Sequence, residues 1–165
     1  MHRAVVSAAI GSLVLIACGP ASAASPTPTA AASRIVCVDA GAANHAYIVV
    51  QHMSGAWVER CIGFAPSFID GQTIMDRSGI EYQTLTVGTT RVVCQVDLEP
   101  RQMAACVNPD QPHWALFVEV GGHWSLSRAG FNDLPLYDKQ ALGWRYVRAS
   151  DTSPSPPPLP HEVRS

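Results

Sequence analysis

The residues in this chain whose types could support chemistry are five cysteines and six histidines. None of the four histidines of the central region stands four residues from another or belongs to an H-E-x-x-H arrangement (His45, His52, His113 and His123). Each is therefore expected to be a surface or strand residue, and we predict no metal site. The sequence also contains no G-x-S-x-G nucleophile elbow and no glycine-rich phosphate loop. We therefore predict a protein without catalytic residues or cofactors, and not an enzyme.

The cysteines are better explained as disulfides than as nucleophiles or metal ligands. Beyond Cys18 there are four, an even number, which in an exported protein indicates two disulfides in one of three connectivities. Cys94 with Cys106 is the favoured pair, because it closes a loop of about a dozen residues and would stabilise the fold by roughly 3 kcal/mol. Cys37 with Cys61 is the pair that remains. Zinc is the rival explanation, but no two cysteines have C-x-x-C spacing.

The N-terminus predicts export. An uncharged apolar run over residues 4–17 follows a short basic start, and it is too short to span a bilayer as a helix. Residues 1–18 are predicted to be a signal peptide with a lipobox, which makes Cys18 the lipidated N-terminus of a cell-membrane lipoprotein. The alternative is ordinary cleavage after Ala23, which would release a secreted protein.

Composition divides the rest of the chain into three parts. Residues 19–33 contain mainly Ala, Ser, Thr and Pro and predict a disordered tether. Residues 34–149 are long enough for one domain with a single core. Residues 150–165 are rich in proline and predict a disordered tail, with docking of a polyproline helix in an aromatic groove as the alternative. The net charge of −2 and the absence of a basic stripe argue against nucleic acid as a partner.

Hydrophobic periodicity predicts an α+β fold, with a mixed or antiparallel sheet, one short helix and two disulfide staples. Residues 46–53 and 56–64 flank Ser54-Gly55 and predict a β-hairpin. The helix is expected over residues 71–78, with Asp70 as its N-cap and Gly79 as its terminating glycine. Further strands are expected over residues 82–87, 91–96, 113–120, 123–127 and 142–147.

The last third of the domain resembles a known family. His113-Trp114, Gly130, Asp133, Asp138 and residues 142–146 fall on a pattern of an aromatic-Trp strand opening, a glycine corner, an acidic turn and a last strand. In this the chain is similar to the C-terminal β-domain of transcobalamin and intrinsic factor and to related bacterial domains. The resemblance implies a β-grasp-like fold. The animal carriers enclose their ligand with a large helical domain that this chain lacks, so the resemblance implies half of such a site.

Two functions follow as hypotheses. By resemblance, the domain is a non-catalytic binding module for a corrinoid-like or other bulky small molecule, held on the hairpin near residues 113–130. Trp114 and Leu116 are expected to make apolar contacts, and Trp124 is expected to offer a stacking face. Polar contacts are expected from Ser125, Ser127 and Arg128, and Gly130 completes the set. The alternative is a protein-interaction or inhibitor domain of the cell envelope that uses residues 97–112, the loop closed by Cys94–Cys106. Such a loop would bind well because its ordering entropy is already lost on folding.

Overall fold

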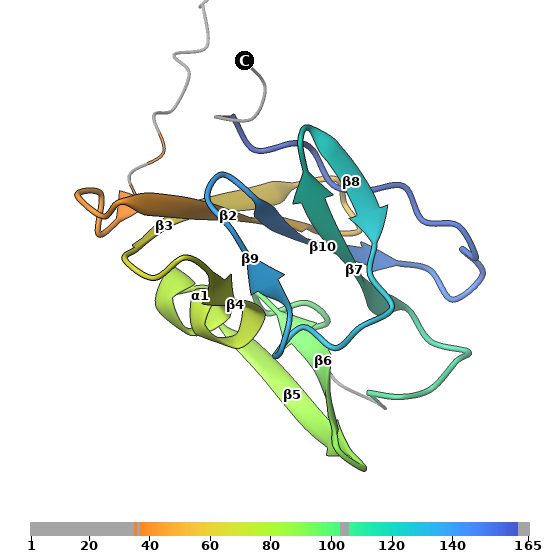
Figure 1. The fold of residues 1–165 in the computed structure, drawn as a ribbon. Coiled ribbons are helices and arrows are strands. Elements are labelled where there is room, and N and C mark those ends of the chain that lie inside the picture. Colours follow the sequence, from red (N-terminus) through yellow and green to blue (C-terminus); the bar gives the residue numbers. More distant parts are fainter. Residues whose placement is uncertain (1–34, 36, 103–105, 162–165) are drawn as a thin grey trace, which may run out of the picture. The chain divides into compact units, whose positions relative to one another are not determined.

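The computed structural model describes residue 35 and residues 37–102 and 106–161, and its main element is a six-stranded mixed sheet. The strand order is β1-β3-β2-β10-β7-β8 (Figure 1). A pair β4-β9 and a hairpin β5-β6 form two small sheets of their own. The bounds are β1 Cys37–Val38, β2 Asn44–Gln51, β3 Trp57–Phe64, β4 Ile69–Asp70, α1 Gly71–Ser78, β5 Tyr82–Val87, β6 Thr90–Val96, β7 His113–Val120, β8 His123–Leu126, β9 Pro135–Leu136 and β10 Ala141–Val147.

The centre of the sheet joins the two ends of the domain. β2 and β3 form the predicted antiparallel hairpin, whereas β10, the last strand, inserts beside β2 and runs parallel to it. β10 also pairs antiparallel with β7, and β7 pairs with β8 through the predicted Gly121-Gly122 turn. The expected mixed sheet with one short helix is therefore confirmed. The sequence predicted seven of the ten strands to within three residues, and it missed the two-residue strands β1, β4 and β9.

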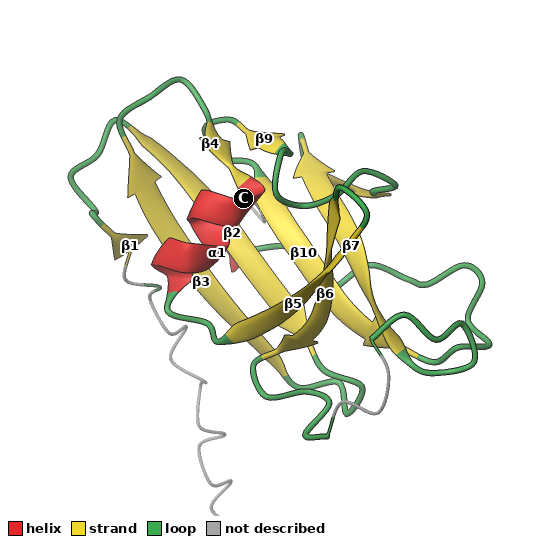
Figure 2. Ribbon diagram, turned by 90° about the horizontal axis from the view of Figure 1, so that it is seen from below, coloured by secondary structure: helices red, strands yellow, loops and turns green. Residues whose placement is uncertain are grey.

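One face of the sheet, here called the inner face, carries the main core. Strand alternation directs the even-numbered side chains of β2, β7 and β10 to this face, including Ile48, Leu116 and Trp144. Ile74 and Met75 of α1 belong to the same buried cluster. Figure 2 shows α1 and the β5-β6 hairpin lying across this face of the sheet.

The short helix begins and ends as predicted. The Asp70 carboxylate accepts hydrogen bonds from the Thr73 backbone N–H at 2.8 Å and from the Thr73 hydroxyl at 2.7 Å. Burial by itself would raise the pKa of Asp70, but these hydrogen bonds outweigh it and hold the pKa below its usual value of 3.8. Gly79 ends the helix in the left-handed conformation, with φ +71°.

The opposite face of the sheet, here called the outer face, is covered by the C-terminal segment. Residues 150–161, here called the C-terminal strap, run along this face (Figure 1), and Pro157 and Pro160 are buried there. This differs from the disordered tail that composition suggested. Buried proline rings lose almost no conformational entropy, so the same composition also suits a segment that packs on an apolar face. Residues 162–165 lie outside the described part of the chain.

Both predicted disulfides are confirmed. Cys37 pairs with Cys61 and ties β1 to β3, with 4.4 Å between their Cα atoms. Cys94 pairs with Cys106 and closes the loop before β7. Two bridges fit an oxidising, extracytoplasmic compartment. The predicted signal peptide, the Cys18 lipidation site and the tether lie outside the described residues. Among the described residues, no helix has the length and apolar character needed to cross a membrane.

Candidate interaction site

The candidate site lies at the end of the sheet where β2 and β10 finish and β7 begins. The parallel pairing of β2 with β10 and the antiparallel pairing of β10 with β7 bring these three strand ends together. The turn after β2 contributes His52 and Met53. Residues 97–112, here called the clamped loop, follow β6 and lead into β7, and residues 103–105 within it lie outside the described residues. Figure 1 shows residues 106–112, just before β7, extending away from the sheet.

His52 connects the turn after β2 to the clamped loop. Its Nδ1 lies 2.8 Å from Glu99 Oε2, and its Nε2 lies 3.0 Å from Asp97 Oδ2. The Met53 backbone N–H also donates to Glu99 Oε2, at 3.2 Å. Both carboxylates accept from the ring when both of its nitrogens carry hydrogen, as they do in the imidazolium form. Hydrogen bonds to charged groups are about twice as strong as neutral ones. The contacts of His52 with Asp97 and Glu99, here called the His52 bracket, therefore fix the first residues of the loop.

The backbone inside this bracket is unusual. Asp97 and Leu98 have φ values of +47° and +62°, so two consecutive non-glycine residues are in the left-handed region. Each such residue costs on the order of 1–3 kcal/mol. The surrounding contacts hold it: Val96 and Glu99 exchange backbone hydrogen bonds at 3.0 and 2.9 Å, and Asp97 N–H donates to Glu81 O at 2.7 Å.

The base of the loop is held from three further directions. The Cys94–Cys106 disulfide joins β6 to the far side of the loop. Gln95 Nε2 donates to the Pro100 carbonyl at 2.6 Å. Trp114, a buried core residue, donates from its indole nitrogen to the Glu99 carbonyl at 3.0 Å. The loop conformation is therefore built into the fold at its base.

This rigid base displays apolar side chains to solvent. Leu98 is 59% exposed and Val107 is 56% exposed, and both belong to the clamped loop. Met53, on the neighbouring turn, is 40% exposed. Single exposed apolar side chains are ordinary on protein surfaces. These differ because Leu98 is displayed by a backbone conformation that costs free energy to maintain.

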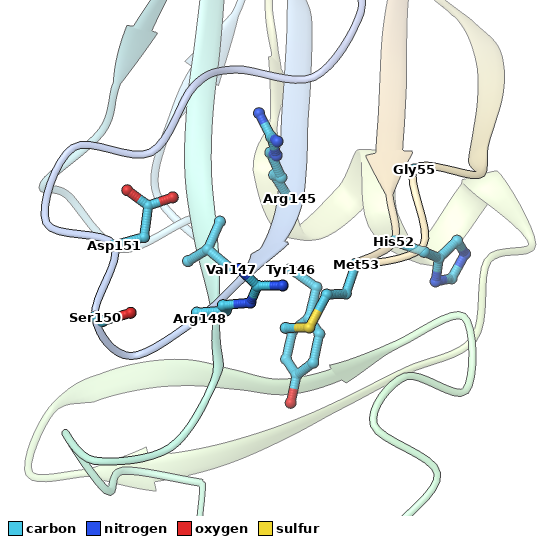
Figure 3. A pocket seen from close by; sticks show the side chains of 9 residues that line it. All are labelled: His52, Met53, Gly55, Arg145, Tyr146, Val147, Arg148, Ser150 and Asp151. Atoms are coloured by element: carbon cyan, nitrogen blue, oxygen red, sulfur yellow. The ribbon is translucent and has the colours of Figure 1, made fainter.

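Two pockets at this end of the sheet share Tyr146, and the second is lined in part by the clamped loop. The first has a volume of about 340 Å³ and is shown in Figure 3; its lining residues are His52, Met53, Gly55, Arg145, Tyr146, Val147, Arg148, Ser150 and Asp151. The second, of about 170 Å³, lies between the disulfide and Trp114. Burial and the charge of Glu99 raise the pKa of Tyr146, so its hydroxyl stays protonated and remains a hydrogen-bond donor at neutral pH.

The residues expected to bind a bulky small molecule are not brought together. Trp114 and Leu116 are buried in the inner-face core, whereas Trp124 pairs with Glu119 and so lies on the outer face. The Trp124 ring packs over Gly143 and Pro157 there. The remaining polar set lies at or beyond the end of β8, with Ser125 and Arg128 exposed and Ser127 and Gly130 half-buried. Strand alternation therefore separates the predicted contacts onto two faces.

Sequence reasoning did not identify the bracket of His52, Asp97 and Glu99. His52 lies 45 and 47 residues from its two partners, so no local spacing could indicate that they meet. Among the described residues, no group of three or more His, Cys, Asp or Glu side chains is arranged to hold a metal ion. The two ring nitrogens of His52 each contact a different carboxylate.

No protein-family model matches the chain, so no such model supports the expected link to transcobalamin-like domains, and no curated protein matches it. In structure the chain is similar to a "putative metal binding protein" from Ruminococcus gnavus ATCC 29149. The match covers 64% of this chain and 97% of that one, with 14% identity and a TM-score of 0.45. At this level the relationship is distant.

Proposed function

We propose that this protein is an exported, non-catalytic binding module that recognises another protein through the clamped loop. The observation that carries the proposal is the display of Leu98, which is 59% exposed in a left-handed conformation fixed by the His52 bracket. Strained backbone persists where the surrounding structure over-determines it, and it is concentrated at ligand clamps and switch regions. A preordered loop also loses little entropy when a partner binds.

The alternative of a corrinoid-like ligand has less support, because its expected contacts lie on two faces of the sheet. We retain the rest of the expectation as part of the proposal. Export through residues 1–18 and lipidation of Cys18 would place the module at the outer surface of a cell membrane. The fold is proposed to be β-grasp-like, supported by an N-terminal hairpin, a helix across it and a last strand parallel to the first strand of that hairpin.

The experiment that tests the proposal places a photo-crosslinking amino acid at position 98 of the full chain and identifies the adducts formed in its own cell envelope. The expected result is one dominant protein adduct that an excess of untagged wild type suppresses by competition, whereas untagged Leu98→Asp or Val107→Asp fails to suppress it. Leu85→Asp is the matched control, because Leu85 is also an exposed leucine, at 45%, and lies on β5 away from the loop. Equal competition by all three variants would contradict the proposal.

A further inference from the structure

The outer face of the sheet is as well buried as the core, although no helix of the described part of the chain covers it. Tyr47, Val49 and Cys61 are 3%, 0% and 0% exposed, and Phe117 is 2% exposed. Strand alternation directs all four away from the inner face. Ile35, Cys37 and Trp124 pack against Tyr47 and Cys61 on this face, and the C-terminal strap covers it at Gly143, where Pro157 lies beside the Trp124 ring.

One end of the strap is held through its backbone. Arg145 Nη1 donates to the carbonyl oxygens of Ser155 and Pro156, at 2.7 and 3.4 Å. Figure 3 shows the Arg145 side chain directed away from Arg148 and Tyr146. A guanidinium that binds backbone carbonyls recognises the course of a chain and not a particular side chain. This contact therefore accepts any extended segment that runs in the same chain direction.

The middle of the strap is recognised as proline. A Cβ atom built on Gly143 would stand 2.8 Å from two atoms of the Trp124 ring and 2.9 Å from Pro157 Cγ. The missing side chain is therefore what lets the indole and the proline ring approach the sheet together. Pro160, three residues further along, is fully buried. Two buried prolines at this spacing, with an aromatic ring beside the first, are the features of polyproline recognition.

The far end is a charged, buried anchor. The Glu59 side chain is 4% exposed, and its oxygens accept from the His161 backbone N–H at 2.9 Å and contact His161 Nδ1 at 2.8 Å. The Trp57 ring stacks on the His161 ring, with centroids 5.3 Å apart. A buried carboxylate is costly unless its oxygens are hydrogen-bonded. Position 161 therefore selects a residue that offers a backbone donor and a cationic or N–H side chain.

The strap is a replaceable occupant. Neither disulfide reaches it, and its residues 151–153, on the side of β10, are exposed. The Trp124 indole nitrogen is buried without a hydrogen-bond partner among the described residues. A buried donor without a hydrogen-bond partner destabilises the arrangement that leaves it so. The resident segment thus fits the face incompletely, and a peptide that offers a carbonyl to Trp124 would fit it better.

We propose that the outer face is a receptor for proline-rich peptides of a partner protein, of the form Pro-x-x-Pro followed by a basic or histidine residue, and that the strap occupies it in the absence of such a peptide. This surface is separate from the clamped loop and goes beyond the function proposed for that loop. Because the strap competes, the apparent affinity of the wild-type chain for a peptide is reduced by the fraction of molecules whose face is vacant.

The test uses the full chain and a labelled synthetic peptide with the sequence of residues 153–161, SPSPPPLPH. We expect weak binding to the wild type by fluorescence anisotropy, and binding at least tenfold tighter to the strap variant Pro160→Ser/His161→Ser. Adding Glu59→Gln should weaken that binding about tenfold, whereas Glu81→Gln, at an exposed glutamate, should leave it unchanged. A peptide with both spaced prolines replaced by alanine should not bind.

Near-UV circular dichroism checks that each variant keeps its packing, and His161→Ser alone repeats the test if the double variant loses it. Failure of the peptide to bind a folded strap variant would overturn the proposal. Binding insensitive to Glu59→Gln would do the same. A concentration-dependent dimer that binds no peptide would also overturn it, and would assign the face to strap exchange between two copies.

Discussion

At the scale of single residues, the most informative side chains are those that hold Leu98 in place. His52 contacts both carboxylates at the start of the clamped loop, at 2.8 and 3.0 Å. Trp114 fixes the carbonyl of one of those residues from the core side. Stability alone would favour glycine or asparagine at a position with φ near +60°. Leu98 is instead 59% exposed in this conformation. An exposed leucine adds nothing to the stability of the loop, but it offers an apolar contact to a binding partner.

Replacing Leu98 with glycine should therefore stabilise the fold and weaken partner binding. We expect the free energy of unfolding to rise by about 1 kcal/mol, because the left-handed strain disappears. This corresponds to a rise of a few degrees in Tm, measured by thermal unfolding of the oxidised protein. Leu85→Gly is the control, since Leu85 lies in a regular strand, and it should cost roughly 0.5–1 kcal/mol. A loss of stability in Leu98→Gly would show that its side chain is a structural contact.

At the scale of elements, the helix α1 shows how short segments depend on both ends. An isolated helix of eight residues is marginal in water, so caps and packing must hold it. Asp70 caps the start, Gly79 terminates the end, and Ile74 and Met75 bury one side. A Cβ on Gly71 would stand 2.0 Å from the Phe131 carbonyl oxygen, so the first turn also requires glycine for close backbone approach.

The cap makes stability depend on pH in a predictable direction. The pKa of Asp70 is lowered in the folded protein, so its contribution is present above about pH 3.8 and is lost as pH falls through the folded value. Asp70→Ala should cost about 1 kcal/mol at pH 7. The difference from wild type should shrink as the pH falls below 3.8, as measured by urea unfolding at about pH 7 and at a pH below that value. An unchanged difference at the lower pH would contradict this assignment, and exposed Asp110→Ala serves as the control.

At the scale of the whole domain, the sheet is a layer with two covered faces. The inner face is covered by α1 and the β5-β6 hairpin, and the outer face is covered by Trp124 and the C-terminal strap. The two covers differ in kind. The first belongs to a large buried cluster, whereas the second is a single extended segment held by Arg145, Gly143 and Glu59.

A methyl group at Gly143 should weaken the packing of Trp124 and the C-terminal strap on the outer face. Gly143→Ala would force apart the Trp124 and Pro157 rings, and overpacking of this kind costs about 1–3 kcal/mol. We expect lower thermal stability together with stronger acrylamide quenching of tryptophan fluorescence. Gly41→Ala is the matched control, because a Cβ there meets nothing within 4 Å. If both variants behave alike, the strap does not depend on close approach at Gly143.

The sequence by itself predicted the helix and the seven longer strands of this protein, and it favoured the observed disulfide pairing among three possible connectivities. Alternation, the Asp70 cap, the Gly79 terminator and the turn at residues 121–122 act within a few residues, so their chemistry can be read locally. Only the tertiary structure decided the sites. His52 meets Asp97 across 45 residues, and Glu59 meets His161 across 102, and a composition rich in proline cannot distinguish a free tail from a docked strap. Such contacts depend on which strand ends the sheet brings together, and strand order is a property of the whole fold.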